Sequence, residues 1–358
     1  MYTIRQEKGW RRMRRRFRRN RAVWWVFVLI ILFFLHIHLI FPERSGDPAD
    51  GTASPAPVDP GEVEILQEPV SAYAISIPVW QDGTVQEQNL EAYLVGVLAA
   101  EMPASFPEEA LKAQAVAARS FILHRAANPP RDGVHDAASL CTQASHCKGY
   151  YPVEEPGMAE ALWGEGAETW LARLEAAVAA TAGEILTYEE APALAAFHAV
   201  SGGRTESAET VWGSAVPYLV EVESPGEEDA RRYQETLRFD RHALKTQLLS
   251  AYPDAVLSDD PEEWLTDVVR SASGTITSIR VGGVATDGAA LRSLLHLNSA
   301  DFTWTVQGAL IEITTLGYGH GVGMSQYGAR AMAAEGADYR EILLHYYPGC
   351  ILETVKNN

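Results

Sequence analysis

The sequence predicts an α+β fold, in which helices pack on antiparallel strands around a cleft, preceded by one transmembrane helix. Apolar residues recur at helical spacing in some segments and alternate in others, which is typical of a mixed fold. The segment 302–316 reads as two strands and 274–283 as a strand pair or a hairpin arm, which favours antiparallel sheets. Residues 23–41 hold no Asp, Glu, Lys or Arg over 19 residues, and about 20 apolar residues span a bilayer.

The basic N-terminus predicts the orientation of that span. Residues 1–22 contain ten Arg or Lys and one Glu, a formal charge of +9, whereas the whole chain carries −18. Arg and Lys concentrate on the cytoplasmic side, so we expect a cytoplasmic tail over 1–22, an anchor in the cell membrane over 23–41, and an extracytoplasmic C-terminal domain. A cleaved signal peptide is the weaker alternative, because no small-residue cleavage site follows the apolar run. The acidic remainder excludes nucleic acid as a partner, since such binding depends on neutralising phosphates.

The rest of the chain divides into a linker and a globular domain. Residues 42–62 are rich in Pro, Gly, Asp and Ala and predict a flexible linker, followed by a domain over 63–358. Helices are expected over 90–100, 107–125, within 158–182, over 287–295 and within 325–347. Strands are expected within 63–80 and over 184–188, 193–201, 274–283 and 302–316. The more charged stretch 226–270 reads as helices on the surface.

One acid stands out at the end of the first helix. Asn89 can cap this helix, whose apolar residues lie on one face, and Glu101 closes it directly before Met102 and Pro103. A carboxylate in this place is either a solvated residue at a frayed helix end or is held in a part-apolar cleft to carry a proton. Exposed Glu is the common state, so the position alone does not decide between the two.

Three long stretches resemble, in the same order, the signatures of the stage II sporulation protein D family, which also includes the amidase-enhancer proteins. They are LEAYLVGVLAAEMPASFPEEALKAQAVAARSF, FHAVSGGRTESAETVWGSAVPYLVEVESPGE and GYGHGVGMSQYGARAMAAEGADYREILLHYYPG. The resemblance covers roughly residues 65–355, and three long matches in order are far more specific than one short motif.

The resemblance implies a membrane-anchored lytic transglycosylase that acts in engulfment during sporulation. Such an enzyme cleaves peptide-stripped glycan strands of peptidoglycan between N-acetylmuramic acid and N-acetylglucosamine and leaves 1,6-anhydro ends. Its catalytic acid is the glutamate of the Ala-Glu-Met-Pro signature, here Glu101. Protonating the leaving oxygen near neutral pH needs a carboxyl group that its surroundings keep protonated, and Met102, Pro103 and Phe106 could provide them. No second carboxylate is needed, because the sugar's own C6 hydroxyl attacks the anomeric carbon.

The resemblance also implies a set of substrate-binding residues along the cleft. They are Lys112, Arg119, His198, Ser201, Gly202, Gly203, Arg204, Glu206, His320, Gly321, Ser325, Gln326 and Tyr327. Lys112 and Arg119 could orient Glu101 or bind the acidic lactyl group of the sugar, although a pair of surface charges is the plainer reading. The alternating glycines of 317–328 allow positive φ angles and close approach of main chain to a sugar, or simply a tight loop.

A cluster of thiols and imidazoles raises the question of a metal. His135, Cys141, His146 and Cys147 fall within HDAASLCTQASHC and make a full tetrahedral set for structural zinc. Some members of the resembled family carry zinc there. A Cys141–Cys147 disulfide is the alternative in an oxidising compartment, and Cys350 is left as a buried thiol. Four protein ligands would leave no open position, so a zinc hydrolase is the weakest interpretation.

Two functions therefore compete for the domain. The first is the lytic transglycosylase, with peptidoglycan glycan strands, the membrane, a cell-wall amidase and a membrane scaffold (stage II sporulation proteins P and M) as the implied partners. The second is a non-catalytic glycan-binding scaffold that stimulates an amidase. Both predict sugar binding, so cleavage of peptide-free strands is what separates them.

Overall fold

The structure is a computed structural model that describes residues 75–129, 138–143 and 146–355. The chain divides into two units, Met1–Leu66 and Gln67–Asn358, and all described residues belong to the second. The predicted tail, membrane anchor and linker over 1–62 lie outside the described residues and stay predictions. Among the helices that are described, none has the length and apolar character that crossing a membrane requires.

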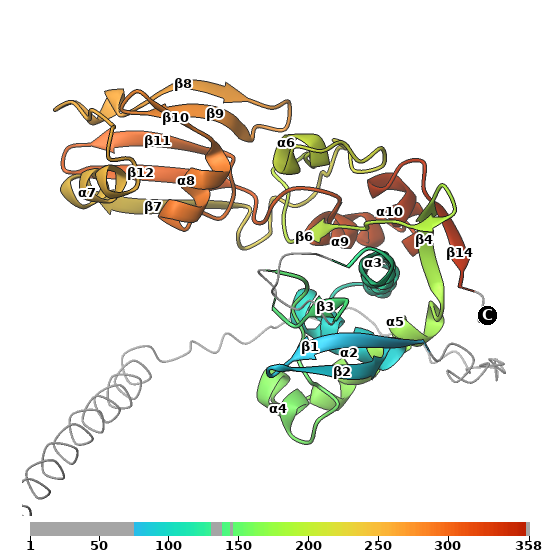
Figure 1. The fold of residues 1–358 in the computed structure, drawn as a ribbon. Helices are drawn as coiled ribbons and strands as arrows, with labels where there is room; N and C mark the ends of the chain where they lie inside the picture. Colours follow the sequence, from blue (N-terminus) through green and yellow to red (C-terminus); the bar gives the residue numbers. More distant parts are fainter. Residues whose placement is uncertain (1–74, 130–137, 144–145, 356–358) are drawn as a thin grey trace, which may run out of the picture. The chain divides into compact units, whose positions relative to one another are not determined.

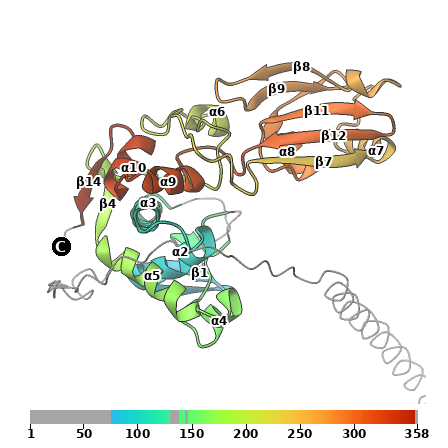
Figure 2. The same cartoon turned by 180° about the vertical axis from the view of Figure 1, so that it is seen from behind.

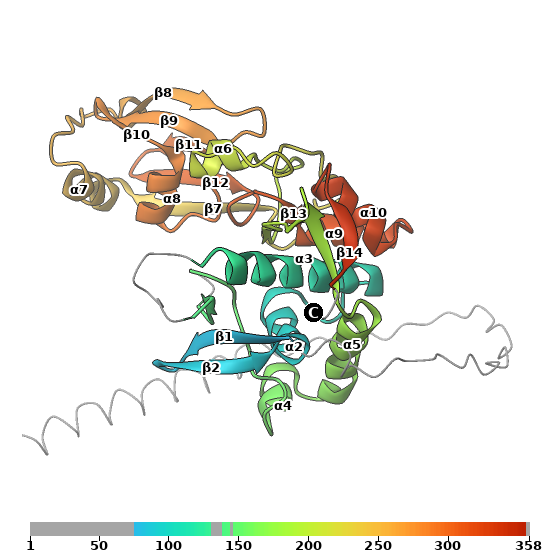
Figure 3. The ribbon, with the colours of Figure 1, turned by 45° about the vertical axis from the view of Figure 1, so that its right-hand side comes forward.

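The first core gathers helices from both ends of the described chain around α3 (Glu108–Ala127). This helix packs against α2 (Leu90–Glu101) and α5 (Ala167–Ala180), and also against α9 (Gln326–Ala334) and α10 (Tyr339–Tyr346). Figure 3 shows α3 between the two C-terminal helices and the α2–α5 pair. Alanine, the strongest helix former, is the commonest residue on its buried face, and its small side chain lets neighbouring helices approach closely.

The helix that ends at Glu101 starts where its sequence predicts. The Asn89 side chain accepts a hydrogen bond from the Ala92 N–H at 3.1 Å, which satisfies one of the unpaired donors at the helix start. At the other end Met102 is extended, with φ −130° and ψ 134°, and its N–H donates to the Leu98 carbonyl. The residue before a proline is biased away from helical geometry, so Pro103 sets this stop and leaves Glu101 as the last helical residue.

The second core lies under two three-stranded antiparallel sheets. The sheets have the orders β10-β9-β8 and β11-β12-β7, and helices α7 and α8 complete this lobe, as Figures 1 and 2 show. Its elements are β7 (Gln234–Asp240), α7 (Arg241–Ala251), a 3-10 turn (Pro261–Glu263), β8 (Leu265–Arg270), β9 (Ile276–Val281), β10 (Val284–Thr286), α8 (Gly288–Leu295), β11 (Phe302–Gln307) and β12 (Leu310–Leu316). The chain enters and leaves the lobe at adjacent points, because the Gly317 N–H donates to the Tyr233 carbonyl at 2.7 Å.

The remaining strands are short and connect distant segments. They are β1 (Ser76–Gln81), β2 (Thr84–Asn89), β3 (Leu140–Cys141), β4 (Glu184–Tyr188), β5 (Ala191–Pro192), β6 (Phe197–His198), β13 (Met324–Ser325) and β14 (Ile351–Thr354). Most pairs are antiparallel, which confirms the predicted α+β class, while β1–β3 and β6–β13 are parallel. The β6–β13 pair brings the second and third family-like stretches together.

Three expectations for individual elements need correction. The single helix predicted within 158–182 is two, α4 (Met158–Trp163) and α5, because Gly164 and Gly166 take positive φ angles between them. The predicted strand 193–201 is regular only at β6. The stretch 226–270, predicted as surface helices, also contains the strands β7 and β8.

Candidate functional site

Glu101 is half-buried, and its carboxylate is held by the main chain of a distant loop. Its Oε1 accepts a hydrogen bond from the Gly149 N–H at 2.9 Å. Of its three predicted apolar neighbours in sequence, Met102 and Phe106 are buried in the first core, whereas Pro103 is exposed. The carboxylate therefore has a fixed position at the surface of the core, with one main-chain donor and access for a ligand.

A buried lysine lies beside this carboxylate. Lys148 precedes Gly149, and its ammonium lies 3.4 Å from the ring centre of Phe197 and 4.4 Å from that of Phe121. Aromatic faces attract cations, so the two rings hold the charge within reach of Glu101. Burial lowers the Lys148 pKa to about 8, although the attraction of Glu101 opposes the shift. Glu101 thus lies beside a positive charge that was not predicted from the sequence.

Two histidines lie next to each other, and one of them, His320, belongs to the glycine-rich loop. The rings of His198 and His320 are 5.7 Å apart, and an exposed tryptophan, Trp212 at the end of α6 (Ala208–Trp212), lies 5.6 Å from His320. Burial lowers the pKa of His198 to about 4 and holds that of His320 well below its usual value, and the nearby Lys148 lowers both further. Both imidazoles are therefore neutral near pH 7.

Hydrogen bonds fix which nitrogen of each imidazole carries the proton. The Val322 N–H donates to Nδ1 of His320 at 3.0 Å, so the proton of the neutral ring is on Nε2. His198 has the opposite arrangement, since its Nδ1 lies 3.2 Å from the Val322 carbonyl and its Nε2 lies 2.8 Å from Ser201 Oγ. The Ser201 hydroxyl therefore donates a hydrogen bond to Nε2 of His198.

The glycines of the loop let its backbone lie directly against the His198 segment. A Cβ on Gly319, which has a φ of +123°, would lie 2.8 Å from the His198 Cβ, and one on Gly323 would lie 2.0 Å from the Ala196 carbonyl oxygen. Gly321 forms part of the same approach, because its carbonyl accepts the Glu206 N–H at 2.7 Å. A side chain at these positions would separate the two walls of the site, so the loop is more than a connection to the C-terminal helices.

A buried acid, Glu227, ties the serines of both walls together. Its carboxylate accepts from the Ser201 N–H at 2.7 Å, from Ser325 Oγ at 2.7 Å and from Ser224 Oγ at 2.5 Å. Ser325 also caps α9, where its Oγ accepts the Gly328 N–H at 3.2 Å. Burial raises the Glu227 pKa to about 7, even though these three hydrogen bonds lower it. Glu227 therefore holds Ser201 and Ser325 in place.

The raised pKa of Glu227 predicts a pH-dependent stability. Between about pH 4.5 and 7 the folded chain holds this proton more tightly than the unfolded chain, so the free energy of unfolding falls as pH rises through this window. A shift of this size corresponds to roughly 3 kcal/mol. Urea unfolding of the wild type and of Glu227→Gln from pH 4.5 to 8 measures it, and their difference should change with pH in this sense. A difference that is flat over this range would contradict the assignment.

The thiol and imidazole cluster lies on the loop that also holds Glu101. The ligand atoms of Cys141, His146 and Cys147 lie within 4.8 Å of one another, and each sulfur is 3.4 Å from His146 Nδ1. The two sulfurs are separate thiols, and Cys350 is a buried thiol as predicted. His135, the fourth predicted ligand, lies outside the described residues. Three donors of this kind fit a tetrahedral metal such as zinc.

The structure gives Lys112 and Arg119 partners within the protein. Lys112 Nζ lies 2.6 Å from Glu108 and 2.9 Å from Glu109. Arg119 is fully buried, and its guanidinium makes a two-point ion pair with Glu91 at 2.8 and 2.7 Å. A substrate-binding role for either residue stays a prediction, and the placement of Arg119 favours a structural role.

The other predicted residues differ in how accessible they are. Gln326 is buried, and its amide lies 3.4 Å from Gln114 on α3. Tyr327 packs edge-on against Phe106 with ring centres 5.0 Å apart. Arg204 is half-buried, and its guanidinium lies 3.6 Å from the Glu223 carboxylate. Gln326 is thus the least accessible of the three.

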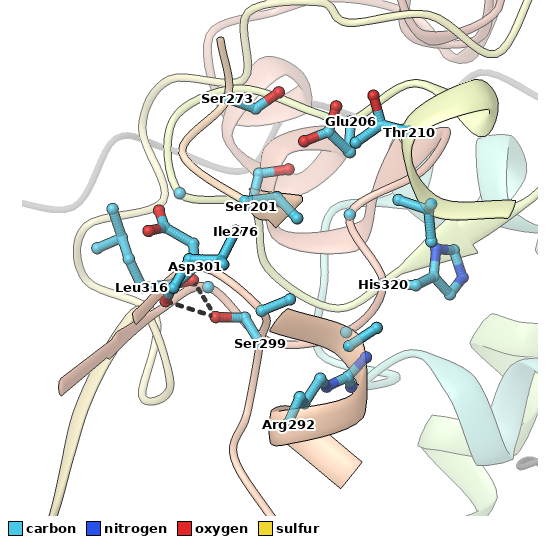
Figure 4. Close-up of a pocket in the computed structure, with 18 of the residues that line it drawn as sticks. Ser201, Glu206, Thr210, Ser273, Ile276, Arg292, Ser299, Asp301, Leu316 and His320 are labelled. Atoms are coloured by element: carbon cyan, nitrogen blue, oxygen red, sulfur yellow. Dashed lines mark hydrogen bonds between the residues drawn. The ribbon is translucent and has the colours of Figure 1, made fainter. Parts of the chain in front are cut away.

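A cavity of about 150 Å³ brings together six of the predicted residues. Figure 4 shows Ser201, Glu206 and His320 around it. The predicted residues that line it are Ser201, Gly202, Arg204, Glu206, His320 and Gly321, and the second lobe adds Ser273, Arg292 and Asp301 among others. Glu101 is not part of this lining. It is connected to it through Lys148, whose charge acts on both Glu101 and His320.

The sequence interpretation missed four residues of the site, namely Lys148, Trp212, Glu227 and Arg292. Trp212 and Glu227 lie inside the second family-like stretch, so their residue types could have been flagged there. Lys148 and Arg292 carry no local signal, because their roles depend on contacts between distant segments.

Comparison with known proteins identifies the family of this chain. A family model described as "Stage II sporulation protein" matches residues 81–188, which contain Glu101 and the Cys–His cluster. The chain is similar to Stage II sporulation protein D of Bacillus subtilis, with 37% identity covering 79% of this chain and 80% of that protein. It is also similar to the protein of the same name from Bacillus amyloliquefaciens, with 36% identity covering 90% and 92%. An amidase enhancer of B. subtilis is 27% identical, covering 72% of this chain but 40% of that longer protein. Identity of this extent shows that the chain belongs to the stage II sporulation protein D family, with a role in the cell wall during sporulation.

Proposed function

We propose that the protein is a lytic transglycosylase that cleaves peptide-stripped glycan strands of peptidoglycan during engulfment. The observation that supports this most directly is the position of the Glu101 carboxyl group, which is half-buried at the end of α2 and fixed by the Gly149 N–H. A single carboxylate held in this way suits a reaction that needs one acid, whereas ordinary glycosidases need two.

In the proposed reaction Glu101 acts first as an acid and then as a base. It donates its proton to the glycosidic oxygen, and the bond between that oxygen and C1 of N-acetylmuramic acid breaks. The C6 hydroxyl of the same sugar then attacks C1 and returns its proton to the Glu101 carboxylate. The product is a 1,6-anhydro end, and the enzyme regains its starting protonation state without consuming water.

The surroundings of His320 offer contacts for a polysaccharide. Trp212 is 44% exposed and lies beside His320. Its indole ring can therefore stack on the face of a sugar. The polar groups of Ser201 and Glu206 and the backbone of the glycine loop line the adjoining cavity. Apolar faces with a few fixed polar groups are typical of ligand-binding sites.

The experiment that tests this function is an analysis of product ends. Peptide-free glycan strands and intact, peptide-bearing strands are incubated with the full-length protein in detergent, and the ends are identified by mass spectrometry. We expect 1,6-anhydro ends from the peptide-free strands only. New reducing ends would indicate hydrolysis instead. Strands that remain uncleaved would contradict the proposed activity.

The amidase-enhancer relative supports one alternative, a non-catalytic scaffold. That protein is named as an enhancer, so this chain could bind glycan and stimulate a cell-wall amidase. Unchanged strands together with a faster amidase reaction would favour it. Under either function we propose anchoring in the membrane through residues 23–41, with an amidase and a membrane scaffold (stage II sporulation proteins P and M) as partners.

We further propose that the Cys–His cluster holds structural zinc. When bound, the metal would cross-link the loop that runs from Cys141 to Gly149, and Gly149 is the residue that holds Glu101. The residues fit the metal, since they supply two thiolates and one imidazole within 4.8 Å of one another.

We expect Cys141→Ser to remove the metal. Elemental analysis of protein purified under reducing conditions should find one zinc per chain in the wild type and very little in the variant, because a hydroxyl is a poor zinc ligand. Cys350→Ser, which alters a buried thiol outside the cluster, is the matched control and should keep its zinc. A wild-type mass that shows a Cys141–Cys147 disulfide would defeat the zinc assignment.

A further inference from the structure

Arg292 is a cation of the site that has no carboxylate partner among the described residues. It lies on α8 and is half-buried, and its Nε is 3.4 Å from the Leu297 carbonyl. Within the described ranges 75–129, 138–143 and 146–355, no carboxylate lies in ion-pair distance of its guanidinium. Lys112 and Arg119, by contrast, are both engaged by glutamates. Burial of a cation without a counter-charge costs free energy. An anionic ligand would supply the counter-charge that Arg292 lacks.

The guanidinium of Arg292 reaches into the cavity beside the candidate site. Figure 4 shows it extending from α8 toward the side where His320 lies. Its charge acts on His198 and His320, as does that of Lys148. The charged side chains that act on both imidazoles are therefore these two cations.

The acids that line the same cavity are already occupied. Asp301 is 3.0 Å from the guanidinium of Arg270. Glu206 accepts hydrogen bonds from the Ser207 N–H at 3.0 Å and from Ser271 Oγ at 2.6 Å. Asp287, the third acid of the lining, accepts the Ala290 N–H at 2.7 Å. None of these three acids forms an ion pair with Arg292.

A second polar group of the cavity also lacks a partner. The hydroxyl oxygen of Ser273 is buried and makes no hydrogen bond with any described residue. Buried polar groups are nearly always paired, and an exception calls for a ligand or a water. The cavity thus combines an unpaired cation with an unpaired hydroxyl, which is a suitable pair for an anion that bears oxygen atoms.

The cavity is large enough for a substituent of a sugar and too small for a run of sugars. Its volume is about 150 Å³, whereas pockets for drug-sized ligands are roughly 300–1,000 Å³. We propose that Arg292 binds the lactyl carboxylate of an N-acetylmuramic acid residue from which the peptide has been removed. This inference rests on the proposed function and explains its preference for stripped strands.

The chemistry of the two substrates differs at this group. In a peptide-bearing strand the lactyl group ends in an amide, which has no charge and continues into a peptide. Removal of the peptide leaves a carboxylate, which a guanidinium can bind with two parallel hydrogen bonds. Arg292 can therefore form an ion pair with the glycan that an amidase has stripped, and it cannot form one with the peptide-bearing glycan on which the amidase acts.

Binding of two matched tetrasaccharides tests the proposal. Both alternate N-acetylglucosamine with N-acetylmuramic acid, and they differ only in carrying free lactyl carboxylates or the methyl amides. Calorimetry is done on the full-length chain in detergent with Glu101→Gln, so that binding is measured without cleavage. We expect the free acid to bind about ten-fold more tightly than the amide, the difference that a charge-assisted pair supplies.

Variants of Arg292 should change this preference and little else. Adding Arg292→Gln should reduce the ratio of the two affinities to within two-fold, with the amide affinity unchanged, and Arg292→Lys should restore part of it. Arg238→Gln is the matched control, since Arg238 pairs with Glu312 on the exposed face of the same lobe. Urea unfolding midpoints show that each variant is folded.

The possible failures are distinguishable. A preference for the acid that survives Arg292→Gln, or an equal loss for both sugars, would overturn the role of Arg292 and leave glycan binding intact. Equal affinity for acid and amide before Arg292 is changed would do the same. If neither sugar binds, the proposed glycan function fails, and the role of Arg292 fails with it.

Discussion

Glu101→Gln is expected to lower the rate of glycan cleavage by about 1,000-fold, the middle of the range for loss of a general acid and base. Glutamine keeps the size of the side chain and can still accept the Gly149 N–H, so the loop that holds it should not move. It can neither give up a proton to the leaving oxygen nor take one from the C6 hydroxyl. The appearance of 1,6-anhydro ends from peptide-free strands measures the rate.

The control for this experiment is Glu168→Gln. Glu168 is an exposed acid in the first turn of α5, so its substitution makes the same chemical change away from the site. We expect this variant to cleave at the wild-type rate. Equal rates for wild type and Glu101→Gln would show that Glu101 has no catalytic role.

Removal of one partner from the buried Arg119–Glu91 pair should have the largest effect on stability. Arg119→Met leaves the Glu91 carboxylate in the core without its counter-charge, and Glu91 is only 3% exposed. Breaking a buried pair in this way typically costs about 3–5 kcal/mol. Urea unfolding of the full-length protein measures the loss. Arg238→Met, which breaks an exposed pair, should cost less than about 1 kcal/mol.

A double variant separates the structural role of Arg119 from a role in substrate binding. Replacement of both charges, in Glu91→Leu with Arg119→Met, leaves no unpaired charge and should recover most of the lost stability. Because neither residue lines the cavity, the folded double variant should still bind peptide-free glycan. A folded double variant that no longer binds glycan would instead support a substrate-binding role for Arg119.

The sequence predicted elements well where local signals agree. Asn89 and Pro103 mark both ends of α2, and the structure confirms this helix because capping and proline geometry act within a few residues. The strand β7 was missed, since its charged residues suggest a surface helix. Leu237 and Phe239 alternate with these charges and face the second core, which is the signature of a strand with one wet face.

The candidate site was predictable to a smaller extent. Glu101 and the Cys–His cluster could be named from family-like stretches, and His198 and His320 do lie together. The partners of these residues could not be named, because Lys148 approaches Glu101 through the fold and Arg292 enters from a lobe with no quoted motif. The exposure of the individual side chains could not be predicted from the sequence either, because the burial of Arg119 depends on a glutamate in another helix.

The adjacent entry and exit of the second lobe, where Gly317 bonds to Tyr233, have a consequence for biosynthesis. The strand β13 and helices α9 and α10 complete the surroundings of α3 only after the whole inserted lobe has been translated. A nascent chain carries Glu101 early but lacks the glycine loop and its histidine until residues 317–346 emerge. The order of translation thus keeps the emerging polypeptide from assembling the complete site before its last segment is made.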